Sequence, residues 1–147
     1  MATLATRAPD LVLRGRKVVG GVTEGEALVT DQTISGWGGV NPMRGEIIET
    51  RHQLRGQSFA DKILVFPGAK GSSGWSGVFH TTRLTNKAPR GLLYTTTTTK
   101  AALGAVVLRV PSMTDFDSDP ISQIATGDWV RIDADAGEVL VWKGGRP

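Results

Sequence analysis

One stretch of the chain, residues 61–94, limits the possible folds more than any other. Residues 61–66 contain an apolar run that predicts a buried strand, and residues 78–87 space their apolar side chains for a half-buried helix. Residues 91–94 then return to a strand-like pattern. This order predicts a βαβ unit with a parallel pair of strands, because parallel neighbours need a crossover connection.

A glycine-rich turn connects the first strand of this unit to the helix. Residues 68–77 read GAKGSSGWSG, so that Ser72 and Ser73 precede the predicted helix. Backbone N–H groups at a helix N-terminus favour a bound anion. The turn is not a phosphate-binding P-loop, because Gly71 separates Lys70 from the first serine. Spacing alone leaves Ser72 as either a helix cap or a residue that does chemistry.

The rest of the chain is rich in short strand patterns and turns. Nineteen glycines and seven prolines favour a β-rich fold over a helix bundle. We expect an opening hairpin, in which residues 17–22 pair with residues 26–30 across an acidic turn, and a closing hairpin of residues 129–133 and 138–142. The apolar residues 100–108 fit a short buried helix or a strand equally well.

Length and composition indicate one globular domain. The 147 residues are 39% hydrophobic and 21% charged, which is enough to bury a core. No run of 18 apolar residues predicts a transmembrane helix, and no secretory signal is visible. We expect a tail over residues 1–10, one domain over residues 11–143 and a short tail over residues 144–147. The absence of cysteine excludes disulfides and fits a cytoplasmic location.

Neither the charge pattern nor the two histidines mark a nucleic-acid or metal site. The net charge is +3, but the basic residues are scattered, whereas nucleic-acid binding needs clustered cations. His52 and His80 lie far apart and show no metal-ligand spacing. His80 is also poorly aligned to take a proton from Ser72, which argues against a Ser-His-Asp triad.

A second glycine-rich segment surrounds Trp37. Gly36, Gly38 and Gly39 flank this tryptophan so closely that a regular element is excluded. Two interpretations stay open: a turn held by Trp37 in the core, or a loop that lines a site or a subunit contact. Trp37, Gly38, Gly39 and His52 are therefore candidates to line the site or an interface.

Five short segments, in order along the chain, resemble the small subunit of the aconitase X group of dehydratases. They are residues 25–29 (GEALV), 37–42 (WGGVNP), 52–58 (HQLRGQS), 68–74 (GAKGSSG) and 126–133 (TGDWVRID). The resemblance extends from about Lys17 to Trp142. It implies an α/β fold, namely a swivelling β/β/α domain with a β-rich, barrel-like core and a βαβ unit, equivalent to the mobile last domain of aconitase.

The resemblance also implies a hydro-lyase made of two chains. A separate large subunit would carry the iron or iron–sulfur centre on its own cysteines, and this chain would bind no metal or cofactor. Ser72 would supply the catalytic base. Gly71, Ser73 and Gly74 would offer N–H groups to the developing anion, with Lys70 as an electrostatic helper.

Two substrates are known for the resembled family. Bacterial members dehydrate cis-3-hydroxy-L-proline to Δ1-pyrroline-2-carboxylate, and archaeal members dehydrate 5-phosphomevalonate in the mevalonate pathway. We expect the first, because a phosphorylated substrate would need clustered cations, which the sequence does not show. Aconitase has an arginine directly after its Ser-Ser pair where this chain has Gly74, which argues against citrate-type recognition. A non-catalytic binding domain is the alternative from another class.

Overall fold

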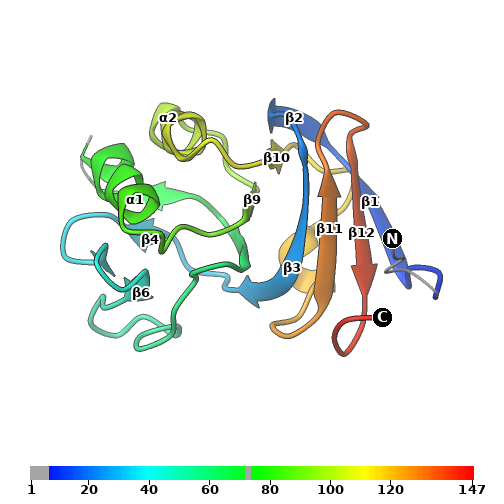
Figure 1. Ribbon diagram of the computed structural model, residues 1–147, viewed down its shortest axis with the longest axis horizontal. Helices are drawn as coiled ribbons and strands as arrows, with labels where there is room; N and C mark the ends of the chain where they lie inside the picture. Colours follow the sequence, from blue (N-terminus) through cyan, green and yellow to red (C-terminus); the bar gives the residue numbers. More distant parts are fainter. Residues whose placement is uncertain (1–6, 72–73) are drawn as a thin grey trace.

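The computed structural model describes residues 7–71 and 74–147 (Figure 1). Ser72 and Ser73 lie outside these described residues. The strands are β1 (Leu11–Arg14), β2 (Arg16–Val19), β3 (Val22–Val29), β4 (Ile34–Ser35), β5 (Val40–Asn41), β6 (Glu46–Ile47), β7 (Ile63–Phe66), β8 (Ala69–Lys70), β9 (Gly91–Tyr94), β10 (Ser112–Thr114), β11 (Trp129–Asp133) and β12 (Glu138–Trp142). The helices are α1 (Trp75–Leu84), α2 (Thr99–Leu108) and α3 (Pro120–Gln123). None of these helices is long and apolar enough to cross a bilayer.

The main sheet is a nearly closed barrel of eight strands. Its order is β1-β12-β11-β3-β7-β9-β10-β2, and the strands at its two edges, β1 and β2, are separated in the chain only by Gly15. One continuous segment therefore supplies both edges. A Cβ atom at position 15 would lie 2.9 Å from the Thr114 carbonyl oxygen and 2.8 Å from the Phe116 ring, so this corner requires glycine.

The predicted βαβ unit is confirmed. Strands β7 and β9 pair in parallel, with Phe66 opposite Tyr94, and α1 makes the crossover between them. Strand β3 pairs in parallel with β7, and β10 pairs in parallel with β9. Four parallel strands therefore run side by side, and their carboxyl ends meet at one edge of the sheet.

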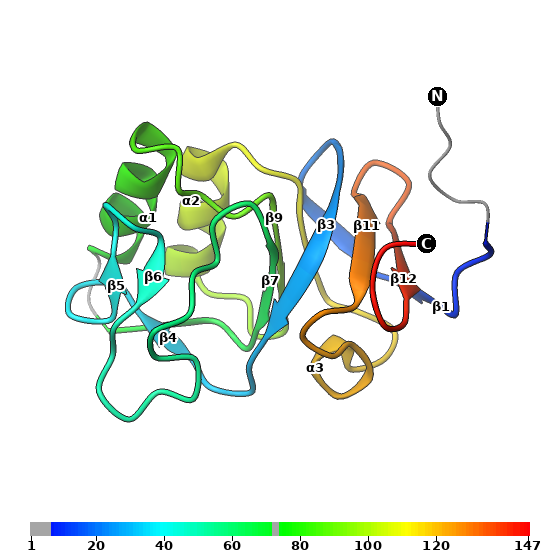
Figure 2. The same cartoon turned by 60° about the horizontal axis from the view of Figure 1, so that its bottom comes forward.

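Two hydrophobic cores lie on opposite faces of the parallel strands. From β7, Ile63 and Val65 contribute to the barrel core, whereas Leu64 and Phe66 pack in the core beneath the helices. Both faces of the strand are buried, which explains its uninterrupted apolar sequence. Helices α1 and α2 lie together on one side of the sheet (Figure 1). The excursion that carries β4, β5 and β6 lies beside α1 (Figure 2).

The prediction of an opening hairpin is wrong. Strand β2 pairs with β10, and β3 pairs with β11 and β7, so that β2 and β3 are not partners. The acidic turn expected between them lies inside the eight-residue strand β3. Gly25 misled the prediction: it sits within the strand where the Asp61 carbonyl approaches, and a Cβ there would lie 3.3 Å from that oxygen.

The helix boundaries also differ from the predictions. Helix α1 spans Trp75–Leu84, three residues earlier than expected at each end. Thr85 is its C-cap, and the helix goes no further because Asn86 has φ +61°, a left-handed conformation that stops a helix. The segment that the sequence left open is helix α2, whose N-cap Thr98 accepts a hydrogen bond from the Ala101 N–H. The closing hairpin of β11 and β12 is confirmed.

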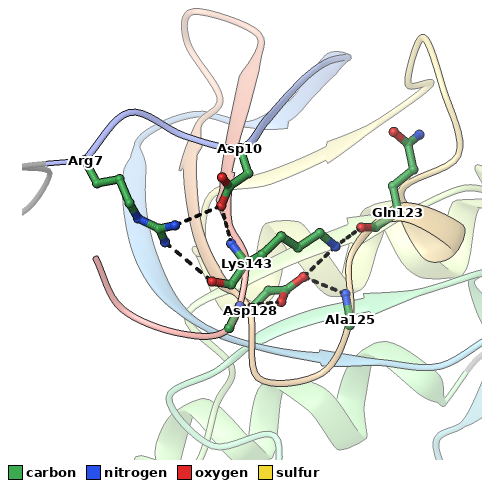
Figure 3. Close-up of polar contacts among 7 residues, drawn as sticks. Arg7, Asp10, Gln123, Ala125, Asp128 and Lys143 are labelled. Atoms are coloured by element: carbon green, nitrogen blue, oxygen red, sulfur yellow. Dashed lines mark hydrogen bonds and ion pairs between the residues drawn. The ribbon is translucent and has the colours of Figure 1, made fainter.

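A buried carboxylate fastens the end of the chain to the barrel (Figure 3). Asp128 is 4% exposed, and its oxygens accept hydrogen bonds from the Ala125 N–H at 2.8 Å and the Gly144 N–H at 3.1 Å. The Lys143 ammonium lies 2.9 Å from the same carboxylate. Arg7, in turn, donates to the Lys143 carbonyl at 3.4 Å.

The same turn fixes the carboxyl end of β3. The Asp128 carbonyl accepts from the Ala27 N–H at 2.8 Å, and the Thr126 hydroxyl accepts from the Val29 N–H at 2.9 Å. Because β3 leads directly to Thr30 and Asp31, this turn sets where the chain leaves the sheet at the carboxyl ends of the parallel strands.

Candidate active site

Two clefts lie at the carboxyl ends of the parallel strands, the edge at which open α/β sheets bind ligands. They share Asp31, which follows β3, and Pro67, which follows β7. One cleft is acidic, with a volume of about 570 Å³. It is further lined by Thr95, Asp115, Phe116, Ser118, Asp119, Pro120 and Ile121. The other, also about 570 Å³, is further lined by Gln32, Thr33, Glu49, Thr50, Arg51, His52 and Lys70. We call the second the Lys70 cleft.

Residues 68–74, which we call the glycine-serine loop, leave the sheet beside the Lys70 cleft. Gly68 has φ +157° and passes the Thr96 carbonyl so closely that a Cβ would lie 3.1 Å from it. The two-residue strand β8 follows and pairs in parallel with β4, which the sequence did not predict. Gly71 then takes φ +98°, and Gly74 is the N-cap residue of α1. Ser72 and Ser73, between them, lie outside the described residues, so their assigned roles stay predictions.

Trp75 anchors the helix that follows this loop. Its indole N–H donates to the Ile34 carbonyl at 2.8 Å, and its ring stacks on Phe79 with centroids 4.2 Å apart. The Phe66 ring stacks on the Trp75 ring as well, with centroids 6.2 Å apart. These contacts hold the N-terminus of α1 against β4 and β7, and so fix the end of the loop that leads into the helix.

Lys70, one of the predicted site residues, forms an ion pair in the cleft. Its ammonium lies 2.6 Å from a Glu49 carboxylate oxygen, and the other oxygen of Glu49 accepts from the Ser35 N–H at 3.2 Å. Burial opposes the charge on Glu49, but the hydrogen bonds from Lys70 and Ser35 outweigh it and lower the pKa of Glu49.

Three basic residues from separate parts of the chain lie in this loop, at it, or in the cleft beside it. Lys70 and Arg51 line the same cleft, and the Lys100 ammonium, from α2, donates to the Gly71 carbonyl. Arg51 has φ +70°, an uncommon conformation for a residue with a side chain. The scattered basic residues of the sequence gave no sign of this group, because each is isolated along the chain.

His52 lines the cleft but has both ring nitrogens engaged. Nδ1 accepts from the Leu54 N–H at 3.1 Å, and Nε2 lies 3.2 Å from the Thr33 carbonyl, to which it donates. The side chain is 6% exposed. It thus holds the loop 49–54 in place and is a poor candidate for proton transfer.

Trp37 is exposed rather than buried. Its relative exposure is 73%, which excludes the interpretation of a turn held by Trp37 in the core. Gly38 has φ +79°, and a Cβ at Gly39 would lie 2.3 Å from the Ser35 carbonyl, so both glycines are required by the tight turn. The turn directly follows β4, the partner of β8, and therefore lies next to the glycine-serine loop.

No part of the described chain fits an iron centre. The sequence has no cysteine, and the described residues contain no group of three His, Asp or Glu side chains placed to hold a metal ion.

Comparison with known proteins agrees with this geometry. The sequence profile of the aconitase X swivel domain matches residues 12–141. The chain belongs to the aconitase X swivel-domain family. This confirms the fold expected from the five sequence segments.

Two curated relatives of this aconitase X swivel domain carry the same name. The phosphomevalonate dehydratase small subunit of Thermococcus kodakarensis is 41% identical over 133 residues, which are 90% of this chain and 98% of the relative. That of Methanococcoides burtonii is 33% identical over 124 residues, 84% of this chain and 90% of the relative. These names do not support the hydroxyproline dehydratase that the sequence led us to expect, and they favour its alternative.

A solved structure has the same fold. The crystal structure of Thermococcus kodakaraensis aconitase X in its holo-form aligns with a TM-score of 0.84 and 41% identity. The alignment covers 90% of this chain and 99% of the matched chain. The swivel domain therefore aligns with its relatives over almost their entire length.

Proposed function

We propose that this chain is the small subunit of a two-chain dehydratase that acts on 5-phosphomevalonate. The observation that carries the proposal is the full-length alignment with phosphomevalonate dehydratase small subunits, at up to 42% identity. A large subunit is the partner, because the relatives are named as small subunits. The iron or iron–sulfur centre belongs to that partner and would supply Lewis-acid chemistry when bound.

The cations of the Lys70 cleft support a phosphorylated substrate. Arg51 and Lys70 line this cleft, and Lys100 lies at the adjacent Gly71 carbonyl. A phosphoryl group carries more negative charge than a carboxylate and is best bound by several cations. The absence of a cation cluster in the sequence was the reason to expect hydroxyproline. Three basic side chains at one edge of the fold weaken that reason, although Asp31 and Glu49 line the same cleft.

Ser72 is proposed as the catalytic base. In the dehydration, a proton leaves the carbon next to the carboxylate, the hydroxyl group leaves the neighbouring carbon as water, and a carbon–carbon double bond forms. A serine alkoxide requires strong stabilisation of its charge. Helix α1 begins at Trp75, three residues after Ser72 in the sequence, and the positive end of its dipole would favour a negative charge on the base.

The turn that carries Trp37 is proposed as a contact for the large subunit. A tryptophan that is 73% exposed is unusual on a free surface and typical of an interface anchor. The turn follows β4, the strand that pairs with β8, so a second chain bound here would lie close to the glycine-serine loop.

The proposal is tested by preparing this chain together with the large subunit from the same organism. The purified complex is assayed with 5-phosphomevalonate and, separately, with cis-3-hydroxy-L-proline. We expect turnover of the phosphorylated substrate only. Turnover of hydroxyproline alone would identify the other enzyme of the family. A stable chain that never binds a large subunit would support a non-catalytic binding domain.

A further inference from the structure

Glu49 is the most completely engaged acidic side chain of the Lys70 cleft. One carboxylate oxygen accepts from the Ser35 N–H at 3.2 Å, and the other lies 2.6 Å from the Lys70 ammonium. Its side chain is only 19% exposed. The Glu49 carbonyl also accepts from the His52 N–H at 3.1 Å. Backbone and side chain of Glu49 are therefore both fixed by the structure.

These contacts span the two strands of the small sheet. Ser35 on β4 and Lys70 on β8 are opposite one another in the parallel pair, and Glu49 bonds to both. Because the lysine of this ion pair is about half exposed, solvent screens the pair, and stability alone is a weak reason for the arrangement. The effect of Glu49 is geometric: it holds a flexible lysine side chain at one place in the cleft.

Lys70 keeps donors for a ligand. An ammonium has three N–H groups, and Glu49 accepts from one of them. Within the described part of the chain, the Lys70 ammonium donates to no other acceptor. Two N–H groups of this cleft-lining lysine therefore have no acceptor among the described residues. Because the pair is neutral overall, its contribution to binding is a directed hydrogen bond rather than a long-range field.

We infer that Glu49 is a positioning residue, which acts through Lys70 to bind an oxyanion of the substrate. The inference depends on the proposed function for the identity of that substrate, whose phosphoryl and carboxylate groups are both oxyanions. An oriented lysine loses little side-chain freedom when the ligand binds, whereas a lysine without Glu49 must first be ordered.

A double-mutant cycle in the two-chain complex tests this inference. Glu49→Gln keeps the size of the side chain and its acceptor for Ser35, but removes the charge that holds Lys70. We expect Glu49→Gln and Lys70→Gln each to raise KM for 5-phosphomevalonate about tenfold, with kcat changed less than about threefold. The double variant should be no worse than Lys70→Gln alone, because the two residues act as one unit.

Glu26→Gln is the matched control. Glu26 on β3 forms an ion pair with Lys62 at 3.5 Å and lines neither cleft. We expect its KM to equal that of the unmodified complex. An unchanged KM in Glu49→Gln, or losses that add in the double variant, would overturn the inference. A rise in KM that is accompanied by a clearly lower melting temperature of the Glu49→Gln complex would also overturn it, because the variant would then have lost structure.

A binding measurement separates this inference from the proposed function. Inorganic phosphate and acetate are titrated into the unmodified and Glu49→Gln complexes by calorimetry. Weaker binding of phosphate in the variant assigns the phosphoryl group to Lys70, and weaker binding of acetate assigns the carboxylate. If the unmodified and Glu49→Gln complexes bind each probe with equal affinity, the role of Glu49 is refuted, even where the complex turns over 5-phosphomevalonate. Weaker binding without any such turnover would refute only the proposed substrate.

Discussion

Gly104 of helix α2 lies directly against the indole ring of Trp75 on helix α1. A Cβ atom at position 104 would be 2.2 Å from the ring, well inside van der Waals contact. Trp75 is the first residue of α1, immediately after the glycine-serine loop. The close packing of the two helices therefore also sets the position of the loop at the edge of the cleft.

This contact predicts that Gly104→Ala lowers the free energy of unfolding by about 1–3 kcal/mol, because the added methyl group overpacks the core. Gly77→Ala is the control, since Gly77 lies in α1 with nothing within 4 Å of a built Cβ. Alanine should there stabilise the helix by about 0.5–1 kcal/mol. Urea denaturation measures both. Equal effects of the two substitutions would show that the helices are not packed as described.

The buried carboxylate of Asp128 predicts a loss of stability in acid. Burial opposes its charge, but hydrogen bonds from Ala125, Lys143 and Gly144 lower the pKa of Asp128 in the folded state. The contribution of ionised Asp128 to the free energy of unfolding is thus complete above the unfolded-state pKa of about 3.9. It is lost as the pH falls through the lower pKa of the folded state.

Asp128→Asn should therefore lower the free energy of unfolding at neutral pH by about 1–3 kcal/mol. It should also flatten the decline of that free energy below about pH 4, because the variant has no carboxylate to protonate at this position. Denaturation curves at a series of pH values measure both effects. An unchanged acid slope would mean that another carboxylate causes the decline.

The exposed Trp37 predicts separate effects on folding and on assembly. Trp37→Ala should change the stability of the free chain by less than about 0.5 kcal/mol. It should weaken binding to the large subunit by about 2 kcal/mol, roughly 30-fold. Val22→Ala serves as the control and should leave binding unchanged. Val22 is the first residue of β3 and is 52% exposed. Unaltered affinity in Trp37→Ala would place the interface elsewhere.

Local sequence patterns were sufficient where neighbours in the chain are also neighbours in space. The apolar run before the glycine-serine loop and the closing hairpin both belong to this class, and both predictions are confirmed. The prediction for the opening strands failed because β2 pairs with β10, which lies far away in the sequence, and no local signal marks such a partner. The same limit applies to the closure of the barrel at Gly15.

The site was predicted only in part for the same reason. Lys70 was a candidate because it lies within the glycine-serine loop. Glu49, Arg51 and Lys100 are isolated in the sequence, and only the folded chain brings them to that loop. Glu49 lies two residues beyond the end of β6, in the loop that contains His52, and carries no recognisable motif.

The central claim is that this chain supplies the catalytic base of a dehydratase, and Ser72→Ala tests it most directly. The variant is prepared with the large subunit, and the turnover of 5-phosphomevalonate is measured alongside the iron content and the stoichiometry of the complex. The account predicts that turnover is lost while the iron content and the complex are unchanged. Near-normal turnover by the Ser72→Ala complex would contradict it.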